Sequence, residues 1–135
     1  MTRQVNYAII FLGMKKILLI EDEVSFQKLM GDQLKRDGYE VISAEDGKKG
    51  LDTAISKHPD LILLDLKLPI MDGLTVLGKL RQDSWGKDAK VIVLTNLEPD
   101  KEILAKVLVN KPALYLVKSN IKLSELKEKI LNILL

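Results

Sequence analysis

The alternation of short apolar runs with helical patterns is the feature that most restricts how this chain can fold. Five apolar runs are typical of buried strands, over residues 16–20, 39–44, 61–64, 90–95 and 114–117. Apolar residues at helical spacing predict helices beginning near Phe26 and over residues 46–57, 74–82, 98–109 and 122–134. Strand and helix that alternate five times predict an α/β fold, a doubly wound five-stranded parallel sheet with helices on both faces.

The alternating pattern begins at Met14, which divides the chain into two parts. We expect one domain over residues 14–135 and an N-terminal extension over residues 1–13 that is not part of the core. The apolar run Tyr7 to Leu12 is too short to cross a bilayer, and no small-residue cleavage site of a signal peptide follows it. We interpret the extension as an upstream addition or a misassigned start; the alternative is an extra strand or a segment that packs on a partner.

Composition removes several classes of function. The chain has no cysteine, which excludes disulfides, thiolate metal sites and cysteine nucleophiles, and its single histidine excludes a multi-histidine metal site. A net charge of +2 from 21 basic and 19 acidic residues, scattered along the chain, gives no basic stripe for nucleic acid. With 47% hydrophobic and 30% charged residues, we expect a soluble cytoplasmic domain with no direct binding to nucleic acid or membrane.

Polar side chains follow four of the five predicted strands. They are Glu21, Asp22 and Glu23 after the first strand, Asp65 after the third, Thr95 at the end of the fourth with Asn96 next to it, and Lys118 after the fifth. The carboxyl ends of parallel strands lie at one edge of the sheet, and ligands bind there beside the point where strand order reverses. We therefore expect these side chains to converge on one crevice.

Clustered carboxylates, a hydroxyl and an amine together indicate a particular chemistry. Neighbouring carboxylates repel one another unless a cation lies among them, and a site with only oxygen ligands suits Mg²⁺. A carboxylate beside that metal can act as a nucleophile toward phosphorus, while a lysine and a hydroxyl bind the phosphoryl oxygens. The alternatives are that Asp65 is a turn residue, that the first acids are a solvated helix start, and that Thr95 and Lys118 are ordinary strand and surface residues.

Over residues 14–135 the chain resembles the receiver domain of two-component response regulators, of the stand-alone, single-domain type. The resemblance rests on the acid pair Glu21–Asp22, "LLDLKLPIMDG" around Asp65, "VIVLTN" around Thr95, and "YLVK" ending in Lys118. It implies a flavodoxin-like fold with strand order 2-1-3-4-5.

The resemblance also implies a role for individual residues. Asp65 would be the phosphoacceptor, charged by a sensor histidine kinase, a histidine phosphotransfer protein or a small phosphodonor. The implied ligands of Mg²⁺ are Glu21, Asp22, Asp65 and the backbone carbonyl of Lys67. The implied phosphoryl-binding and switch residues are Thr95, Tyr115 and Lys118. The protein would then be a phosphorylation-activated signalling switch that binds an unknown downstream protein, a monomer or weak dimer, and not an enzyme beyond its own phosphorylation and dephosphorylation.

The chain departs from the family pattern at several positions. Ser119 stands where relatives carry a proline after a cis bond, so we predict a trans Lys118–Ser119 peptide, with Ser119 or Asn120 turning the chain by side-chain-to-backbone hydrogen bonds. Asn96 replaces a small residue and would crowd the phosphoryl pocket. Pro112 should end the fourth helix before the last strand.

Other functions remain as alternatives. A pseudo-receiver would keep the fold and act as a docking module without phosphorylation. A flavodoxin-like cofactor binder is disfavoured because "EDEVS" is anionic and repels phosphate, and an aspartate-dependent phosphatase because Lys67 stands where a second aspartate is usual. Since nothing follows Leu135, we expect no output domain in this chain.

Overall fold

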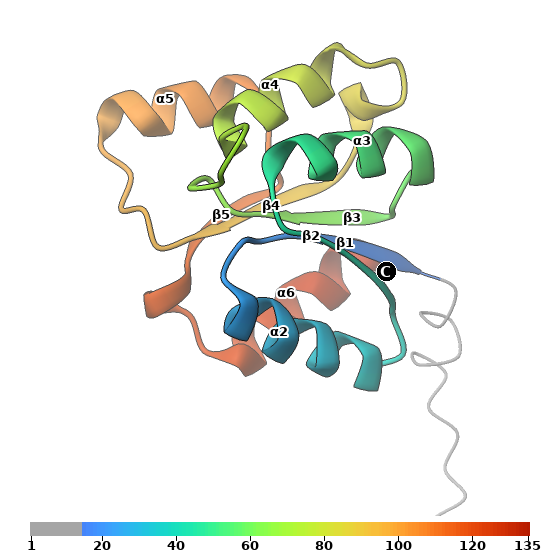
Figure 1. The fold of residues 1–135 in the computed structure, drawn as a ribbon. Coiled ribbons are helices and arrows are strands. Elements are labelled where there is room, and N and C mark those ends of the chain that lie inside the picture. Colours follow the sequence, from blue (N-terminus) through green and yellow to red (C-terminus); the bar gives the residue numbers. More distant parts are fainter. Residues whose placement is uncertain (1–14) are drawn as a thin grey trace, which may run out of the picture.

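The computed structural model describes residues 15–135, in which strands and helices alternate as the sequence predicts (Figure 1). The strands are β1 (Lys16–Ile20), β2 (Glu40–Ala44), β3 (Leu61–Leu64), β4 (Val91–Thr95) and β5 (Leu114–Val117). The helices are α2 (Val24–Arg36), α3 (Gly47–Lys57), α4 (Gly73–Gln82), α5 (Lys101–Val109) and α6 (Leu123–Leu134), with 3₁₀ turns η1 (Gly86–Asp88) and η2 (Lys118–Asn120). The predicted extension at residues 1–13 lies outside the described residues.

The strands form one parallel sheet in the order β2-β1-β3-β4-β5, which confirms the predicted topology. Helices α3, α4 and α5 cover one face of the sheet, and α2 and α6 cover the other (Figure 1). The chain moves from β1 to β2 on one side and then returns to place β3 on the other side. Strand order therefore reverses between β1 and β3, and a crevice is expected beyond the carboxyl ends of these two strands.

The two faces of the sheet bury separate apolar clusters. Successive residues of a strand point to opposite faces, so Leu61 and Leu63 of β3 pack with α2 and α6, while Ile62 and Leu64 pack with α3, α4 and α5. All four residues are buried. A strand covered on both faces needs a continuous apolar run, and "LILL" supplies it. Burial of each such side chain stabilises the fold by about 1.5–3 kcal/mol, which fixes the position of the residue that follows, Asp65.

Aspartates set the beginnings of three helices. The side chains of Asp46, Asp72 and Asp100 accept hydrogen bonds from backbone N–H groups of the first turns of α3, α4 and α5. The cap at Asp100 explains why α5 begins at Lys101, three residues after the predicted start. Helix α5 ends at Val109, before Pro112, as predicted. Within residues 15–135, no helix combines the length and apolarity that crossing a membrane requires.

Arg81 of α4 ties together two connections of the chain. Its Nε donates to the carbonyl of Asn110 at 2.7 Å, and its Nη2 donates to Lys111 at 3.0 Å. Its Nη1 donates to the carbonyls of Gly86 at 2.8 Å and Ala89 at 2.7 Å. Burial lowers the pKa of Arg81, although the charge of Asp88 opposes this. One half-buried guanidinium therefore anchors both the α4–β4 and the α5–β5 connections.

We expect Arg81→Met to lower the free energy of unfolding by about 2–4 kcal/mol, because four charge-assisted hydrogen bonds are lost while the apolar stem is retained. Urea unfolding followed by circular dichroism measures this loss. Arg36→Met is the matched control, since Arg36 is an exposed arginine in the last turn of α2, and it should change stability by less than about 0.5 kcal/mol. Equal midpoints for the two variants would show that the Arg81 hydrogen bonds add no net stability.

Candidate functional site

The polar residues that follow the strands line one cleft at the carboxyl edge of the sheet. The cleft has a volume of about 400 Å³, and its lining residues are Glu21, Asp22, Glu23, Asp65, Lys67, Thr95, Asn96 and Lys118. These residues come from the ends of β1, β3, β4 and β5. The structure thus brings together the side chains that the sequence predicts at this edge. Tyr115 alone among the predicted site residues is outside this lining.

The carboxylate of Asp65 is held by donors from three parts of the chain. The backbone N–H of Asp65 donates to the carbonyl of Ile20 at 3.1 Å, and this bond continues the β1–β3 pairing to the strand end. Its Oδ1 accepts from the hydroxyl of Thr95 at 2.6 Å and from the backbone N–H of Lys67 at 3.2 Å. Its Oδ2 accepts from Lys118 Nζ at 3.0 Å. Both oxygens have fixed partners, although the residue stays 7% exposed toward the cleft.

Gly73, at the start of α4, allows the chain to pack closely against Asp65. Its backbone N–H donates to the carbonyl of Leu66 at 2.8 Å. A β-carbon at this position would lie 2.2 Å from the carbonyl oxygen of Asp65, and neither backbone could move without disturbing the strand end. The glycine of the "MDG" motif is therefore required for the α4 helix to begin directly beside the site.

Glu21 is a buried acid at the end of β1, with 1% of its surface exposed. One oxygen accepts from the backbone N–H of Glu23 at 2.9 Å, and the other accepts from Lys118 Nζ. Burial raises the pKa of Glu21 above 4.5, while the hydrogen bonds from Lys118 and Glu23 oppose the rise. Ionised Glu21 therefore depends on nearby positive charge.

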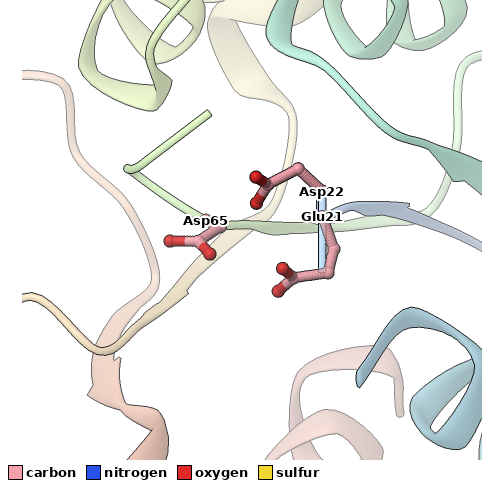
Figure 2. A group of neighbouring side chains, drawn as sticks. All are labelled: Glu21, Asp22 and Asp65. Carbon is pink, nitrogen blue, oxygen red and sulfur yellow. The ribbon is translucent and has the colours of Figure 1, made fainter. Parts of the chain in front are cut away.

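Glu21, Asp22 and Asp65 form the group of acids in this cleft that could hold a metal ion (Figure 2). One carboxylate oxygen from each residue lies within 4.8 Å of the others. Asp22 is exposed, whereas Glu21 and Asp65 are buried, so the group is open to solvent on one side. Oxygen ligands with this charge and access fit a hard divalent cation such as Mg²⁺. Lys67 lines the same cleft, and its backbone carbonyl as a further ligand stays a prediction.

Lys118 connects the two buried acids. Its Nζ donates to Asp65 and to Glu21, and its side chain is 7% exposed. Burial alone would lower the pKa of Lys118, but the hydrogen bonds to both acids outweigh it and the pKa lies above 10.5. The ammonium also lies over the ring of Phe26, 4.3 Å from its centroid. A cation is therefore held between the two buried acids, Glu21 and Asp65.

The chain leaves β5 through a turn that the sequence predicts only in part. No cis peptide bond occurs within residues 15–135, so the trans Lys118–Ser119 bond is confirmed. The prediction that Ser119 or Asn120 turns the chain by side-chain-to-backbone hydrogen bonds is wrong. Residues Lys118–Asn120 form the 3₁₀ turn η2, whose backbone redirects the chain, and the Asn120 side chain donates to the Glu98 carboxylate at 3.4 Å.

Thr95 and Tyr115 meet at the same residue of the β4–α5 loop. The fully buried hydroxyl of Thr95 donates to Asp65 and accepts from the backbone N–H of Leu97 at 3.3 Å. The hydroxyl of half-buried Tyr115 donates to the carbonyl of Leu97 at 2.6 Å, and burial raises the pKa of this phenol above 10.0. A continuous path of contacts thus runs from Asp65 through Thr95 and Leu97 to Tyr115. Asn96, in the same loop, is exposed at the cleft.

Sequence reasoning missed two residues of α2 that support the site. Gln27 Nε2 donates to the carbonyls of Glu21 at 2.8 Å and Ala44 at 3.4 Å, which fixes the end of β1 against the end of β2. Phe26 reads in the sequence only as an apolar helix residue, yet its ring contacts the Lys118 ammonium. Both residues lie in the first turns of the helix that follows the acid pair, and this position in the sequence could have indicated that they support the site.

Ile70 lies in a strained conformation in the loop between β3 and α4. Its φ is 71°, the left-handed region that β-branched residues avoid, and it is 79% exposed. The backbone N–H of Met71 donates to the carbonyl of Pro69 at 2.7 Å and closes a tight turn around Ile70. Pro69 is therefore the first residue of that turn.

We expect Ile70→Asn to raise the free energy of unfolding by about 1 kcal/mol, because asparagine tolerates positive φ and little apolar contact is lost. Thermal unfolding of the metal-free protein measures the gain. Val109→Asn is the control, since Val109 is 76% exposed without a positive φ, and it should bring no gain. A stability gain of the same size in both variants would show that the gain comes from replacing an exposed apolar side chain with a polar one, and not from relief of backbone strain.

Comparison with known proteins identifies the family. The model of the response regulator receiver domain matches residues 17–131. The DNA-binding dual master transcriptional regulator RpaA of Synechocystis sp. is 44% identical over 84 residues, 62% of this chain and 35% of the relative. Sporulation initiation phosphotransferase F of Bacillus subtilis is 32% identical over 81 residues, 60% of this chain and 64% of the relative. The chain thus spans about a third of the length of the first curated relatives that it matches.

Solved structures agree with this match. The response regulator protein TrrA from Thermotoga maritima, in complex with Mg(2+)-BeF, superposes with a TM-score of 0.77 at 35% identity, over 89% of this chain and 99% of that one. The receiver domain of a sensor histidine kinase from Pseudomonas aeruginosa, with a magnesium ion in its active-site cleft, gives 0.77 at 30% identity, over 87% and 94%. The fold, the family model and the relatives agree, and the chain belongs to the response regulator receiver domain family.

Proposed function

We propose that this protein is a phosphorylation-activated switch of a two-component system and that Asp65 accepts the phosphoryl group. The observation that supports the proposal most is the state of the Asp65 carboxylate. It is nearly buried, is bound by Thr95 and Lys118, and still opens to a cleft with two further acids. A structural aspartate at a strand end would need neither a lysine nor a second acid beside it.

The residues of the cleft have matching roles in the transfer. An oxygen of Asp65 attacks phosphorus, and the bond from phosphorus to the donor breaks. That bond is to a histidine nitrogen of a sensor kinase or phosphotransfer protein, or to an acetate oxygen of acetyl phosphate, and the departing group keeps the electron pair. Lys118 neutralises charge on the phosphoryl oxygens, and the hydroxyl of Thr95 donates a hydrogen bond to one of them.

Glu21, Asp22 and Asp65, with the backbone carbonyl of Lys67, would hold Mg²⁺. When bound, the ion supplies positive charge that offsets the three acids and the incoming phosphoryl oxygens. The close approach of the carboxylates supports this proposal. So do the relatives from Thermotoga maritima and Pseudomonas aeruginosa, whose structures contain magnesium.

Thr95 and Tyr115 would carry the signal away from Asp65. When Thr95 turns toward a phosphoryl oxygen, its hydrogen bond with the N–H of Leu97 changes, and the carbonyl of the same residue holds the Tyr115 hydroxyl. The loop and the tyrosine therefore move together and alter the surface that a downstream protein binds. We propose that the protein acts in the cytoplasm as a monomer or weak dimer, through that protein contact and not through nucleic acid or enzymatic turnover.

Intact-mass spectrometry after incubation with acetyl phosphate tests the proposal. The protein should gain one phosphate when Mg²⁺ is present and none when it is chelated. Asp65→Asn should gain none, whereas Asp52→Asn, which changes an exposed acid of α3, should behave as the unchanged protein does. Absence of phosphate on the unchanged protein would favour the docking module without phosphorylation, and phosphate on Asp65→Asn would place the acceptor elsewhere.

A further inference from the structure

We propose that Phe26 is a positioning residue, whose ring face holds the Lys118 ammonium where it contacts Asp65. The inference rests on the proposed function, because Asp65 is there the phosphoacceptor. The ammonium nitrogen lies 4.3 Å from the ring centroid, within the range in which a cation is attracted to the face of an aromatic ring. The Lys118 side chain is 7% exposed, so little water competes for this contact.

Lys118 needs an additional partner because its own backbone gives it limited restraint. A lysine side chain is a point charge on a flexible four-carbon stem, and it has no planar group that fixes its direction. Directly after Val117 the chain enters the η2 turn, where Ser119 and Asn120 are exposed. Glu21 and Asp65 both attract the ammonium, so the acids alone do not decide how it is shared between them.

Phe26 differs from the two acids in the nature of its attraction. The ring carries no net charge, takes up no proton and offers no ligand to a metal ion. Its hold on Lys118 therefore stays the same when the charge on Glu21, Asp22 or Asp65 changes. It is placed in the first turn of α2, the helix that follows the acid pair, and packs in the apolar cluster between α2, α6 and the sheet. The helix that begins at the acids thus also carries the support for the lysine.

The competing interpretation is that Phe26 only fills space. Its side chain borders a small apolar pocket of about 130 Å³, together with Met30, Leu94 and Leu126. A leucine at position 26 could fill much of the space that the Phe26 side chain fills, but it has no ring face, whereas a tyrosine keeps the ring face. The two interpretations therefore give different results for Phe26→Leu and Phe26→Tyr, which makes this pair of variants the test.

The first measurement is the rate of phosphate incorporation from acetyl phosphate with Mg²⁺ in excess. Phe26→Leu should lower the rate by about threefold to thirtyfold, the range expected for loss of one largely desolvated cation–ring contact. Phe26→Tyr should restore it to within about twofold. Met30→Leu is the matched control, because Met30 borders the same pocket on the same helix, and its rate should not change. A Phe26→Leu variant that is phosphorylated as fast as the control would overturn the proposal.

The second measurement is independent of phosphorylation. In proton–carbon NMR spectra, the ε-methylene protons of Lys118 should be shifted upfield by the ring of Phe26 in the unchanged protein and in Phe26→Tyr, and the shift should vanish in Phe26→Leu. Unshifted Lys118 protons in the unchanged protein would overturn the proposal even if a variant does not fold. If Lys118 shows the ring shift but no protein is phosphorylated, the proposed function fails while the contact stands.

Discussion

Lys118→Met is expected to lower the free energy of unfolding by about 3–5 kcal/mol near neutral pH, because it leaves two buried carboxylates without their shared cation. Methionine keeps most of the apolar length of the side chain, so the loss reports the charge and not a cavity. Glu21 is 1% exposed and Asp65 is 7% exposed, and neither can turn fully into solvent without disturbing a strand end. Chemical unfolding in urea, with circular dichroism and intrinsic fluorescence as two probes, measures the loss.

The pH dependence of this loss has a definite sign. The pKa of Lys118 lies above 10.5 in the folded protein, so the stability that it contributes is fully present below about 10.5 and is lost as pH rises through the folded value. The pKa of Glu21 is raised above 4.5, mainly by burial, so protonation of this acid favours the folded state. Lys118→Met removes a hydrogen bond that holds the pKa of Glu21 down. The difference between the two proteins should therefore be largest near pH 7 and smaller toward pH 4.

Lys87→Met serves as the control for the Lys118 experiment, because Lys87 is an exposed lysine of η1 that does not line the cleft. It should change stability by less than about 0.5 kcal/mol at every pH. A Lys118→Met variant as stable as this control, or one whose loss of unfolding free energy does not vary with pH, would contradict this account. Either result would show that the charges of Glu21 and Asp65 are balanced by groups other than Lys118.

Magnesium is expected to stabilise the folded protein strongly, because Glu21, Asp22 and Asp65 come together only in that state. Above the dissociation constant, each tenfold rise in Mg²⁺ concentration should add about 1.4 kcal/mol to the free energy of unfolding. Asp22→Asn should abolish this response. It should also raise the metal-free stability by up to about 1 kcal/mol, since one of three mutually repelling charges is removed from an exposed position.

Differential scanning calorimetry over a magnesium series measures both effects. Asp52→Asn is the matched control, because it removes an exposed acid of α3 that lies outside the cleft, and it should respond to magnesium as the unchanged protein does. An unchanged melting temperature at millimolar Mg²⁺, or the same response in Asp22→Asn, would contradict a metal site at these acids.

The fold could be predicted because its main determinants are local. The run "LILL" must be buried on both faces, and the alternation of such runs with helical segments leaves few topologies other than a parallel sheet. The strand order, which the resemblance to receiver domains implies, agrees with the structure. The convergence of Asp65, Thr95 and Lys118 also follows from a local property. Asp65 and Lys118 directly follow their strands, Thr95 is the last residue of β4, and parallel strands end at one edge.

The remaining features depend on contacts between distant residues, which periodicity does not encode. Arg81 is bound to the carbonyls of Asn110 and Lys111 in the α5–β5 connection, and nothing in the α4 sequence distinguishes it from a surface arginine. Phe26 reads as an ordinary apolar position until Lys118 is placed above it. At the turn after Lys118 the trans peptide is predicted correctly, but the expected side-chain-to-backbone hydrogen bonds are wrong, because the side chain of Asn120 has a partner in another loop that its own sequence neighbourhood does not reveal.

Chemical trapping of the phosphorylated residue tests the central claim most directly. Borohydride reduces the acyl phosphate of an aspartate to homoserine and releases phosphate, so it leaves a stable mark at the acceptor. The protein is treated with acetyl phosphate and Mg²⁺, reduced, digested and sequenced by tandem mass spectrometry. The account predicts homoserine at residue 65, present only when both phosphodonor and Mg²⁺ were supplied. Homoserine at Asp22 or at another aspartate, with Asp65 unmodified, would contradict it.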